Sequence, residues 1–357
     1  MNDEKLLLEL PAWPQHESVF DRYGVAQDSI FEEDECLLEF NGKRFLSRKD
    51  VHLLSGLPKT GKSTVGWMLV AALVRGENQG FKAVEDGCRV LVADTEQAPA
   101  DVSRRARIFS EETNVGIHNE PADRVRVLRL RKADRDDESA MNVDLNDWRM
   151  TKLVEALEAE HFDFVVVDGV ADICVDFMDA SESTKTCQRL MELSELHNCA
   201  ILVCLHLNPS DLRARGHLGK ELERKCADYL VVCNQTNVYG RRYQLVEHAI
   251  HSRHESFGSM CFAFGEDGRA EAITIDGTTD ERGRLQSLMQ EAFSGRTTMA
   301  ASELKEYLTG NGVPLRTIGR WMAKAVNLGI LTKEKRGVYV LSTTSDFAEI
   351  IDDEDPL

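Results

Sequence analysis

The chain has 357 residues, 42% of them hydrophobic, a length that allows a large α/β domain and a small second domain. It shows no run of about 18 uncharged apolar residues and no signal-peptide pattern, which argues against a membrane-embedded or exported protein. The net charge of −18 at first argues against a nucleic-acid partner. The nine scattered cysteines, without a Cys-x-x-Cys pair, indicate reduced thiols, and we expect a cytoplasmic protein.

Residues 1–45 form a weakly patterned amino-terminal segment. Its last residues belong to a predicted β-hairpin with strands Leu37–Phe40 and Arg44–Leu46, which turns at Asn41-Gly42. We expect the main domain to cover residues 46–276.

A glycine-bounded loop joins the apolar stretch Val51–Ser55 to the helical pattern Val65–Val74. The loop fits G-x-x-x-x-G-K-[ST] and consists of Gly56, Leu57, Pro58, Lys59, Thr60, Gly61, Lys62, Ser63 and Thr64. Its glycines let backbone N–H groups curl around a phosphate, and the helix presents its positive end to the same anion. Lys62 would then reach the β- and γ-phosphates, and Ser63 would bind Mg²⁺. The loop therefore predicts binding of ATP with Mg²⁺.

After the loop, apolar strands alternate with helical segments, which indicates an α/β fold with a mostly parallel sheet. The expected parallel strands are Arg89–Glu96, Val125–Leu130, Phe164–Asp168 and Ala200–Leu205. Three later strands, joined by short turns, indicate an antiparallel extension of the same sheet. They are Tyr229–Cys233, Arg242–His248 and Met260–Phe264.

Two acidic residues end strands of this sheet. Asp168 closes an apolar run, where an acid can hold Mg²⁺ beside a triphosphate, although an ordinary helix-start residue gives the same pattern. Glu96 ends the strand after the loop helix and can accept a proton from the attacking water. Asp94, two residues earlier on the same face, is the alternative base. We favour Glu96, because strand tips project toward the ligand crevice.

The order of these motifs resembles the RecA-type ATPases over about residues 45–265. The resemblance is closest to the DnaB and RepA class of ring-forming replicative helicases, which includes small ATPases of bacterial mobile elements. The segments that carry it are Gly56–Thr64, Val90–Glu96, Val165–Asp168, Cys204–Asn208, Arg215–Gly219 and His251–Arg253. It implies a RecA-like P-loop NTPase core in which Glu96 is the general base and Asp168 the magnesium-associated acid.

The resemblance also implies roles for two later residues. His206 matches the polar sensor at the end of the fourth core strand, usually Gln in the DnaB pattern, and a strand-end histidine without a sensing role is the alternative. Arg253 matches the arginine finger that a neighbouring subunit inserts, which implies a homo-oligomer, with a hexamer as one ring size. The family pattern there is Lys-x-Arg, so His251 departs from it. Arg224 and Lys225 are candidate substitutes for the missing cation.

The segment Pro209–Gly216 matches the family's loop that lines a central channel and touches single-stranded DNA. Arg213 and Arg215 suit phosphate contacts in such a loop. A solvated loop without a DNA contact is the alternative.

Residues 281–342 carry ten basic and five acidic residues, and the acidic tail 343–357 follows them. Three helical patterns and a hairpin in this module resemble a small winged helix-turn-helix domain. One face of the third helix and the hairpin supply candidate DNA-binding residues. They are Arg316, Arg320, Lys324, Lys333, Lys335 and Arg336. We expect contacts with duplex DNA, and a module for protein contacts is the alternative.

Together these features predict a magnesium-dependent ATPase that acts on DNA. The leading hypothesis is a ring-forming helicase or helicase-like motor in replication or mobilisation of a bacterial mobile element. The alternatives are an ATP-switched DNA-binding regulator and a recombination or repair accessory ATPase without unwinding activity. No membrane partner is expected.

Overall fold

The computed structural model describes most of the chain between residues 35 and 341. The described ranges are 35–133, 137–140, 143–236, 242–249, 252–265, 268–273, 281–311, 313, 315–327, 330–334 and 337–341. Most of the amino-terminal segment, the acidic tail, His251, Lys335 and Arg336 therefore lie outside the described residues.

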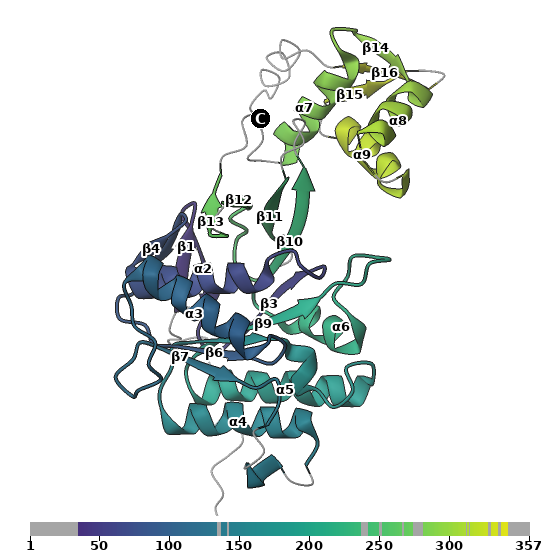
Figure 1. The fold of residues 1–357 in the computed structure, drawn as a ribbon. Coiled ribbons are helices and arrows are strands. Elements are labelled where there is room, and N and C mark those ends of the chain that lie inside the picture. Colours follow the sequence, from purple (N-terminus) through teal and green to yellow (C-terminus); the bar gives the residue numbers. More distant parts are fainter. Residues whose placement is uncertain are drawn as a thin grey trace, which may run out of the picture. The chain divides into compact units, whose positions relative to one another are not determined.

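A nine-stranded sheet forms the centre of the described part of the chain, in the order β13-β12-β11-β10-β3-β9-β8-β6-β7 (Figure 1). The six strands from β10 to β7 in this order are parallel. They are β3 (Val51–Gly56), β6 (Val90–Asp94), β7 (Val125–Arg129), β8 (Phe164–Asp168), β9 (Ala200–His206) and β10 (Tyr229–Thr236). The antiparallel strands are β11 (Arg242–His248), β12 (Ser259–Phe264) and β13 (Ala270–Ala272). The predicted α/β fold with an antiparallel extension is confirmed.

Helices cover both faces of this sheet. Its central strands are therefore buried along nearly their whole length. On one face, α2 (Lys62–Arg75) and α3 (Pro99–Thr113) pack into one apolar cluster. On the other face, α4 (Leu145–Ala159), α5 (Ala180–Leu196) and α6 (Gly216–Lys225) pack into a second cluster (Figure 1). Short 3-10 helices are η1 (Glu138–Ala140) and η2 (Val170–Ile173).

A small antiparallel sheet lies beside α2, in the order β2-β1-β5-β4. Its strands are β1 (Cys36–Phe40), β2 (Lys43–Ser47), β4 (Glu77–Asn78) and β5 (Phe81–Ala83). The predicted hairpin is confirmed, and both turn residues take left-handed conformations, with φ of 51° at Asn41 and 73° at Gly42. No pattern in the sequence predicts β4 or β5. Phe45 and Phe81 pack with Phe257 beneath this sheet.

Side-chain amides bond to both outer strands of the nine-stranded sheet. At β7, Asn119 Nδ2 donates to the carbonyl of Val127 at 3.1 Å, and its Oδ1 accepts the N–H of Val127 at 2.8 Å. At β13, Gln79 Nε2 donates to the carbonyl of Ala270 at 3.1 Å, and its Oε1 accepts the N–H of Ala272 at 2.6 Å. Each amide thus makes the two hydrogen bonds that the backbone of a neighbouring strand would make.

The carboxyl-terminal module has an apolar core of its own. Its helices are α7 (Glu281–Phe293), α8 (Ala301–Gly310) and α9 (Leu315–Asn327). Its strands β14 (Thr298–Ala300), β15 (Leu331–Lys333) and β16 (Val338–Leu341) form a sheet in the order β14-β16-β15. The three predicted helices and the hairpin are present, and β14 adds a strand that the sequence pattern did not predict. Within the described residues, no helix of the chain is long and apolar enough to cross a membrane.

Candidate active site

The phosphate loop connects β3 to α2 in a conformation that requires glycine at its two ends. A Cβ atom on Gly56 would lie 2.5 Å from Thr60 Oγ1 and 2.6 Å from the carbonyl oxygen of Val232, so no larger residue fits there. Gly61 precedes α2 with φ of 98°, a left-handed conformation that favours glycine. The ring of Phe262 lies 3.1 Å from the position of a Cβ on Gly61 and forms a wall of the loop.

Lys62 begins α2, and its ammonium group turns back into the loop. Nζ donates to the carbonyl oxygens of Gly56 at 3.1 Å and Leu57 at 3.3 Å. It also lies 2.9 Å from His206 Nδ1. Burial lowers the pKa of Lys62. A buried cation surrounded by neutral acceptors would gain strongly from the anionic oxygens of a bound phosphate.

The carboxyl ends of the parallel strands bring the predicted residues to one edge of the sheet. The strand register pairs Gly56 of β3 with His206 of β9, and Asp94 of β6 with Asp168 of β8. Residues that stand 74 and 150 positions apart in the chain therefore pair beside the phosphate loop. This is the crevice in which parallel α/β sheets bind ligands.

Asp168 and Asp94 form a buried acidic pair that Gln97 bridges. Gln97 Nε2 donates to Asp94 Oδ2 at 2.6 Å and to Asp168 Oδ2 at 3.1 Å. Burial raises the pKa of Asp168, whose carboxylate also interacts with the hydroxyl of Ser63. Burial raises the pKa of Asp94 to about 6, although backbone N–H groups partly oppose this shift.

These residues fit a magnesium-bound triphosphate. Ser63 and Asp168 supply hydroxyl and carboxylate oxygens, the ligand type that Mg²⁺ prefers. Because two buried carboxylates repel each other, a cation at Ser63 and Asp168 would relieve that repulsion. The donor set and the glycine-bounded loop therefore agree with the predicted cofactors ATP and Mg²⁺.

Glu96 lies in the turn after β6 and is free to face a ligand. Its Oε2 lies 3.6 Å from His206 Nε2, and the interaction with His206 lowers the pKa of Glu96, so its carboxylate is ionised. Asp94 is occupied differently, because its Oδ1 accepts the backbone N–H groups of Glu96 at 3.1 Å and Gln97 at 2.8 Å. This geometry favours Glu96 over Asp94 as the group that accepts a proton.

Arg105 on α3 is a member of this site that sequence reasoning missed. Its Nε donates to Gln97 Oε1 at 3.0 Å, and its Nη1 donates to Thr64 Oγ1 at 3.3 Å. Neighbouring Arg104 instead pairs with Asp101. The sequence places Arg104, Arg105 and Arg107 close together on α3 and does not reveal which of them faces the loop.

The loop that carries Arg213 and Arg215 follows β9 directly. The backbone N–H of Arg215 donates to the carbonyl of His206 at 3.0 Å, and the guanidinium of Arg215 lies 5.0 Å from the centre of the Phe177 ring. Both arginines are exposed. The loop thus begins at the nucleotide edge of the sheet and presents two cations to solvent.

Arg253 lies near the amino-terminal ends of the parallel strands, whereas the phosphate loop follows the carboxyl end of β3. Its Nη1 donates to Asp50 Oδ1 at 2.8 Å, and Asp50 precedes β3, whereas the phosphate loop follows β3. The strand alone separates the two edges by about 20 Å at roughly 3.3 Å per residue. Arg253 is therefore remote from the phosphate loop of its own protomer. Of the candidate substitutes, Arg224 and Lys225 both pair with Glu221.

The candidate DNA-binding residues of the carboxyl-terminal module are only partly described. The backbone of α9 contains Arg316, Arg320 and Lys324, but the side chains of the two arginines lie outside the described residues. Lys333 is exposed on β15. Lys335 and Arg336, between β15 and β16, remain predictions.

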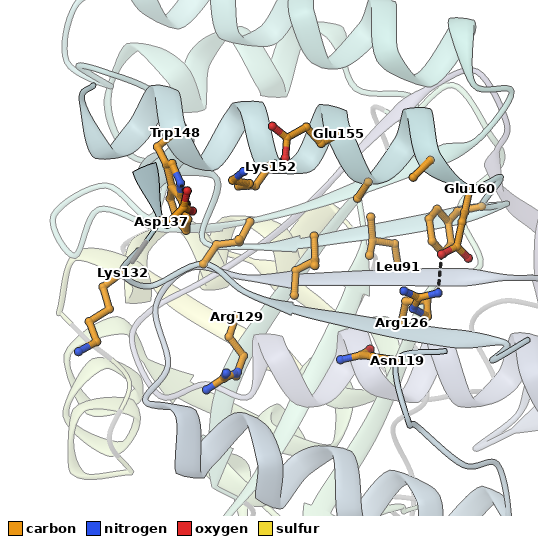
Figure 2. Close-up of a pocket in the computed structure, with 15 residues that line it drawn as sticks. Leu91, Asn119, Arg126, Arg129, Lys132, Asp137, Trp148, Lys152, Glu155 and Glu160 are labelled. Atoms are coloured by element: carbon orange, nitrogen blue, oxygen red, sulfur yellow. Dashed lines mark hydrogen bonds and ion pairs between the residues drawn. The ribbon is translucent and has the colours of Figure 1, made fainter. Parts of the chain in front are cut away.

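A separate cavity of about 450 Å³ lies between α4 and the edge strand β7. Figure 2 shows Trp148, Lys152 and Glu155 on the helix side of this cavity. Glu160 forms an ion pair with Arg126 at its other end. The residues that line it include no member of the phosphate loop, so this cavity is distinct from the candidate active site.

Comparisons with known proteins give one family. A model of the AAA domain matches residues 29–210, about half of the chain, which include the phosphate loop, Glu96, Asp168 and His206. Among solved structures, the chain is similar to a KaiC-like protein from the hyperthermophilic archaeon Pyrococcus horikoshii OT3. The identity is 15%, the TM-score is 0.41, and the match covers 64% of this chain and 91% of that protein. No curated protein matches the chain.

Proposed function

The chain belongs to the AAA domain family, and we propose that it is a magnesium-dependent ATPase that acts on DNA as a ring-forming, helicase-like motor. Its α/β core with a phosphate loop is that of a RecA-type P-loop ATPase, which accounts for nucleotide hydrolysis. The action on DNA, the oligomeric ring and a role in replication or mobilisation of a bacterial mobile element are the further content of the proposal.

The position of His206 is the observation that carries the motor proposal. Its ring lies 2.9 Å from the ammonium of Lys62 and 3.6 Å from the carboxylate of Glu96. Its backbone carbonyl accepts the N–H of Arg215, and the next residue, Leu207, donates to the carbonyl of Gly56. One residue therefore connects the phosphate loop, the candidate base and the exposed arginine loop. A change at the γ-phosphate can reach Arg213 and Arg215 through these contacts.

The hydrolytic step follows from the roles of the chain's own groups. Lys62 binds the phosphate oxygens, and the ionised carboxylate of Glu96 accepts a proton from the attacking water. Ser63 and Asp168 would hold Mg²⁺, which would neutralise charge on the phosphates. Arg253 supplies a further cation to the site of a neighbouring protomer, since it is remote from its own phosphate loop.

The test is ATP turnover with and without single-stranded DNA. We expect DNA to stimulate the wild type, and Lys62→Ala to abolish turnover in both conditions because the phosphates lose their main cation. Lys82→Ala, which removes an exposed cation of β5, is the matched control and should behave like the wild type. Wild-type turnover that is the same with every DNA tested would rule out the motor.

A second candidate function is an ATP-switched DNA-binding regulator. The observation that favours it is the separate core of the carboxyl-terminal module, whose three helices and small sheet suit a winged-helix domain for duplex DNA. A footprint on one duplex site, combined with failure to displace a strand, would support the regulator over the motor.

A further inference from the structure

A buried carboxylate at the amino-terminal edge of the sheet gathers donors from several elements. Asp228 precedes β10 and has no exposed surface. Its Oδ2 accepts the backbone N–H of Leu46 at 2.7 Å and lies 3.0 Å from His52 Nδ1. Its Oδ1 lies 3.0 Å from His248 Nε2 and 2.9 Å from His254 Nδ1. One aspartate thus meets a backbone amide and three imidazoles.

These contacts form an ion pair inside the protein. Burial alone would raise the pKa of Asp228, but hydrogen bonds from His248, His254 and His52 hold it far below its usual range. The bond to Asp228 raises the pKa of His254 to about 10, so His254 carries a proton at neutral pH. His248 Nδ1 lies 3.3 Å from the backbone N–H of Phe257 and accepts it, which leaves the Nε2–H of His248 to donate to Asp228.

The Asp228 cluster fixes the segment that contains Arg253. The backbone N–H of Arg253 donates to the carbonyl of Ala227 at 2.7 Å. The next side chain, that of His254, bonds to Asp228. Two consecutive residues before β10 therefore hold two consecutive residues of the segment after β11.

Asp50 completes this attachment on the solvent side. Its Oδ1 accepts a hydrogen bond from the guanidinium of Arg253, and its Oδ2 accepts one from the hydroxyl of Ser47 at 2.8 Å. The side chain of Arg253 remains about half exposed, so it can leave Asp50 while the backbone stays anchored. The backbone anchor of Arg253 and its half-exposed guanidinium are thus separate.

A buried ion pair contributes little net stability compared with apolar residues of the same volume, but it fixes direction and register. We propose that Asp228 is a positioning residue which, through His254, fixes the segment that presents Arg253 to the nucleotide of a neighbouring protomer. This inference rests on the proposed function, in which Arg253 acts between protomers.

The experiment compares Asp228→Asn and His254→Gln with Arg253→Ala. Loss of an arginine finger costs about 10³- to 10⁵-fold in turnover in related enzymes, and we expect Asp228→Asn to lose at least about 10²-fold in kcat. Binding of ATP should change by less than about threefold, because the phosphate loop lies at the other edge of the sheet. His254→Gln keeps a donor toward Asp228 but removes the charge, and should lose activity to a smaller degree.

Mixing of variants separates positioning from a structural defect. Protomers with Lys62→Ala keep Arg253, and protomers with Asp228→Asn keep Lys62 and Glu96. Each variant alone should be nearly inactive, and a mixture should regain turnover at sites where the two kinds of protomer meet. Asp163→Asn is the control, since Asp163 is a partly buried carboxylate that bonds to Arg48 and not to the Arg253 segment, and it should keep wild-type kcat.

The outcomes distinguish this inference from the proposed function. If Arg253→Ala hydrolyses ATP at the wild-type rate, the proposed role of Arg253 between protomers is wrong, and the inference fails with it. If Arg253→Ala is inactive while Asp228→Asn and His254→Gln both turn over normally, only the inference is wrong. Inactivity of Asp228→Asn and His254→Gln that mixing with Lys62→Ala does not restore would also overturn it.

Discussion

His206 links Lys62 and Glu96 through its two ring nitrogens. The ammonium of Lys62 can only donate, so Nδ1 of His206 must be unprotonated while their 2.9 Å contact exists. The proton then sits on Nε2, which faces the carboxylate of Glu96. The ring of His206 thus offers one acceptor and one donor, one toward Lys62 and one toward Glu96.

Replacement of the two acids near the end of β6 should have different effects. Glu96→Gln removes the proton acceptor, and we expect kcat to fall by about 10²- to 10⁴-fold while ATP still binds. Asp94→Asn weakens the hydrogen bonds by which the carboxylate of Asp94 holds Gln97 in the turn after β6. A lower melting temperature is therefore its main expected effect. Steady-state turnover, nucleotide binding and thermal unfolding measure these changes. Normal kcat in Glu96→Gln would return the base role to Asp94.

At the scale of elements, the close packing of the turns that end β6 and β8 sets the geometry of the site. Gly169 follows β8 with φ of 115°, and a Cβ there would lie 2.2 Å from Thr95 Oγ1 and 2.8 Å from Glu96 Cγ. The carboxylate of Glu96 is therefore positioned by the absence of a side chain on the neighbouring strand's turn.

Gly169→Ala should for this reason reduce both stability and turnover. A left-handed residue other than glycine costs about 1–2 kcal/mol, and a displacement of about 1 Å at a catalytic group can cost 10²-fold in rate. Gly42→Ala is the matched control, because Gly42 also has positive φ and none of the described atoms lies within 4 Å of its Cβ position. We expect Gly42→Ala to lower the urea midpoint but to keep wild-type kcat. Equal kcat in both variants would contradict the packing argument.

The elements that could be predicted are those whose pattern does not depend on distant partners. The central strands are continuous apolar runs, and the Asn41-Gly42 turn has a local signal. Strands β4, β5, β13 and β14 are two or three residues long, so they are strands only because a partner lies beside them. Arg105 could not be selected, because the side of α3 that faces the phosphate loop depends on packing.

At the scale of the whole molecule, Asp228 joins parts of the fold that are distant in sequence. A lone acid after an alanine gave no signal in the sequence, since His52, His248 and His254 reach it from three different segments. Its contacts therefore combine a role in folding with the proposed role in positioning Arg253.

Global stability should decrease with rising pH through His254. Its pKa is about 10 in the folded chain, mainly because of its bond to Asp228, against 6.5 for an ordinary histidine. The folded state keeps a proton that the unfolded state releases above pH 6.5, so this stabilisation is complete below pH 6.5 and is lost as pH rises to about 10. Urea unfolding at about pH 6, 8 and 10 measures the slope. Asp228→Asn should flatten it, and an equal slope in that variant would contradict the assignment.

The amides of Asn119 and Gln79 have a consequence for assembly. Each takes up an N–H and a carbonyl of an outer strand, so neither margin of the large sheet offers a continuous row of groups to a further strand. Edge-to-edge pairing of strands, the route to fibres, is thereby hindered. The ring proposed above would therefore depend on contacts made through side chains, with Arg253 of one copy in the crevice of the next.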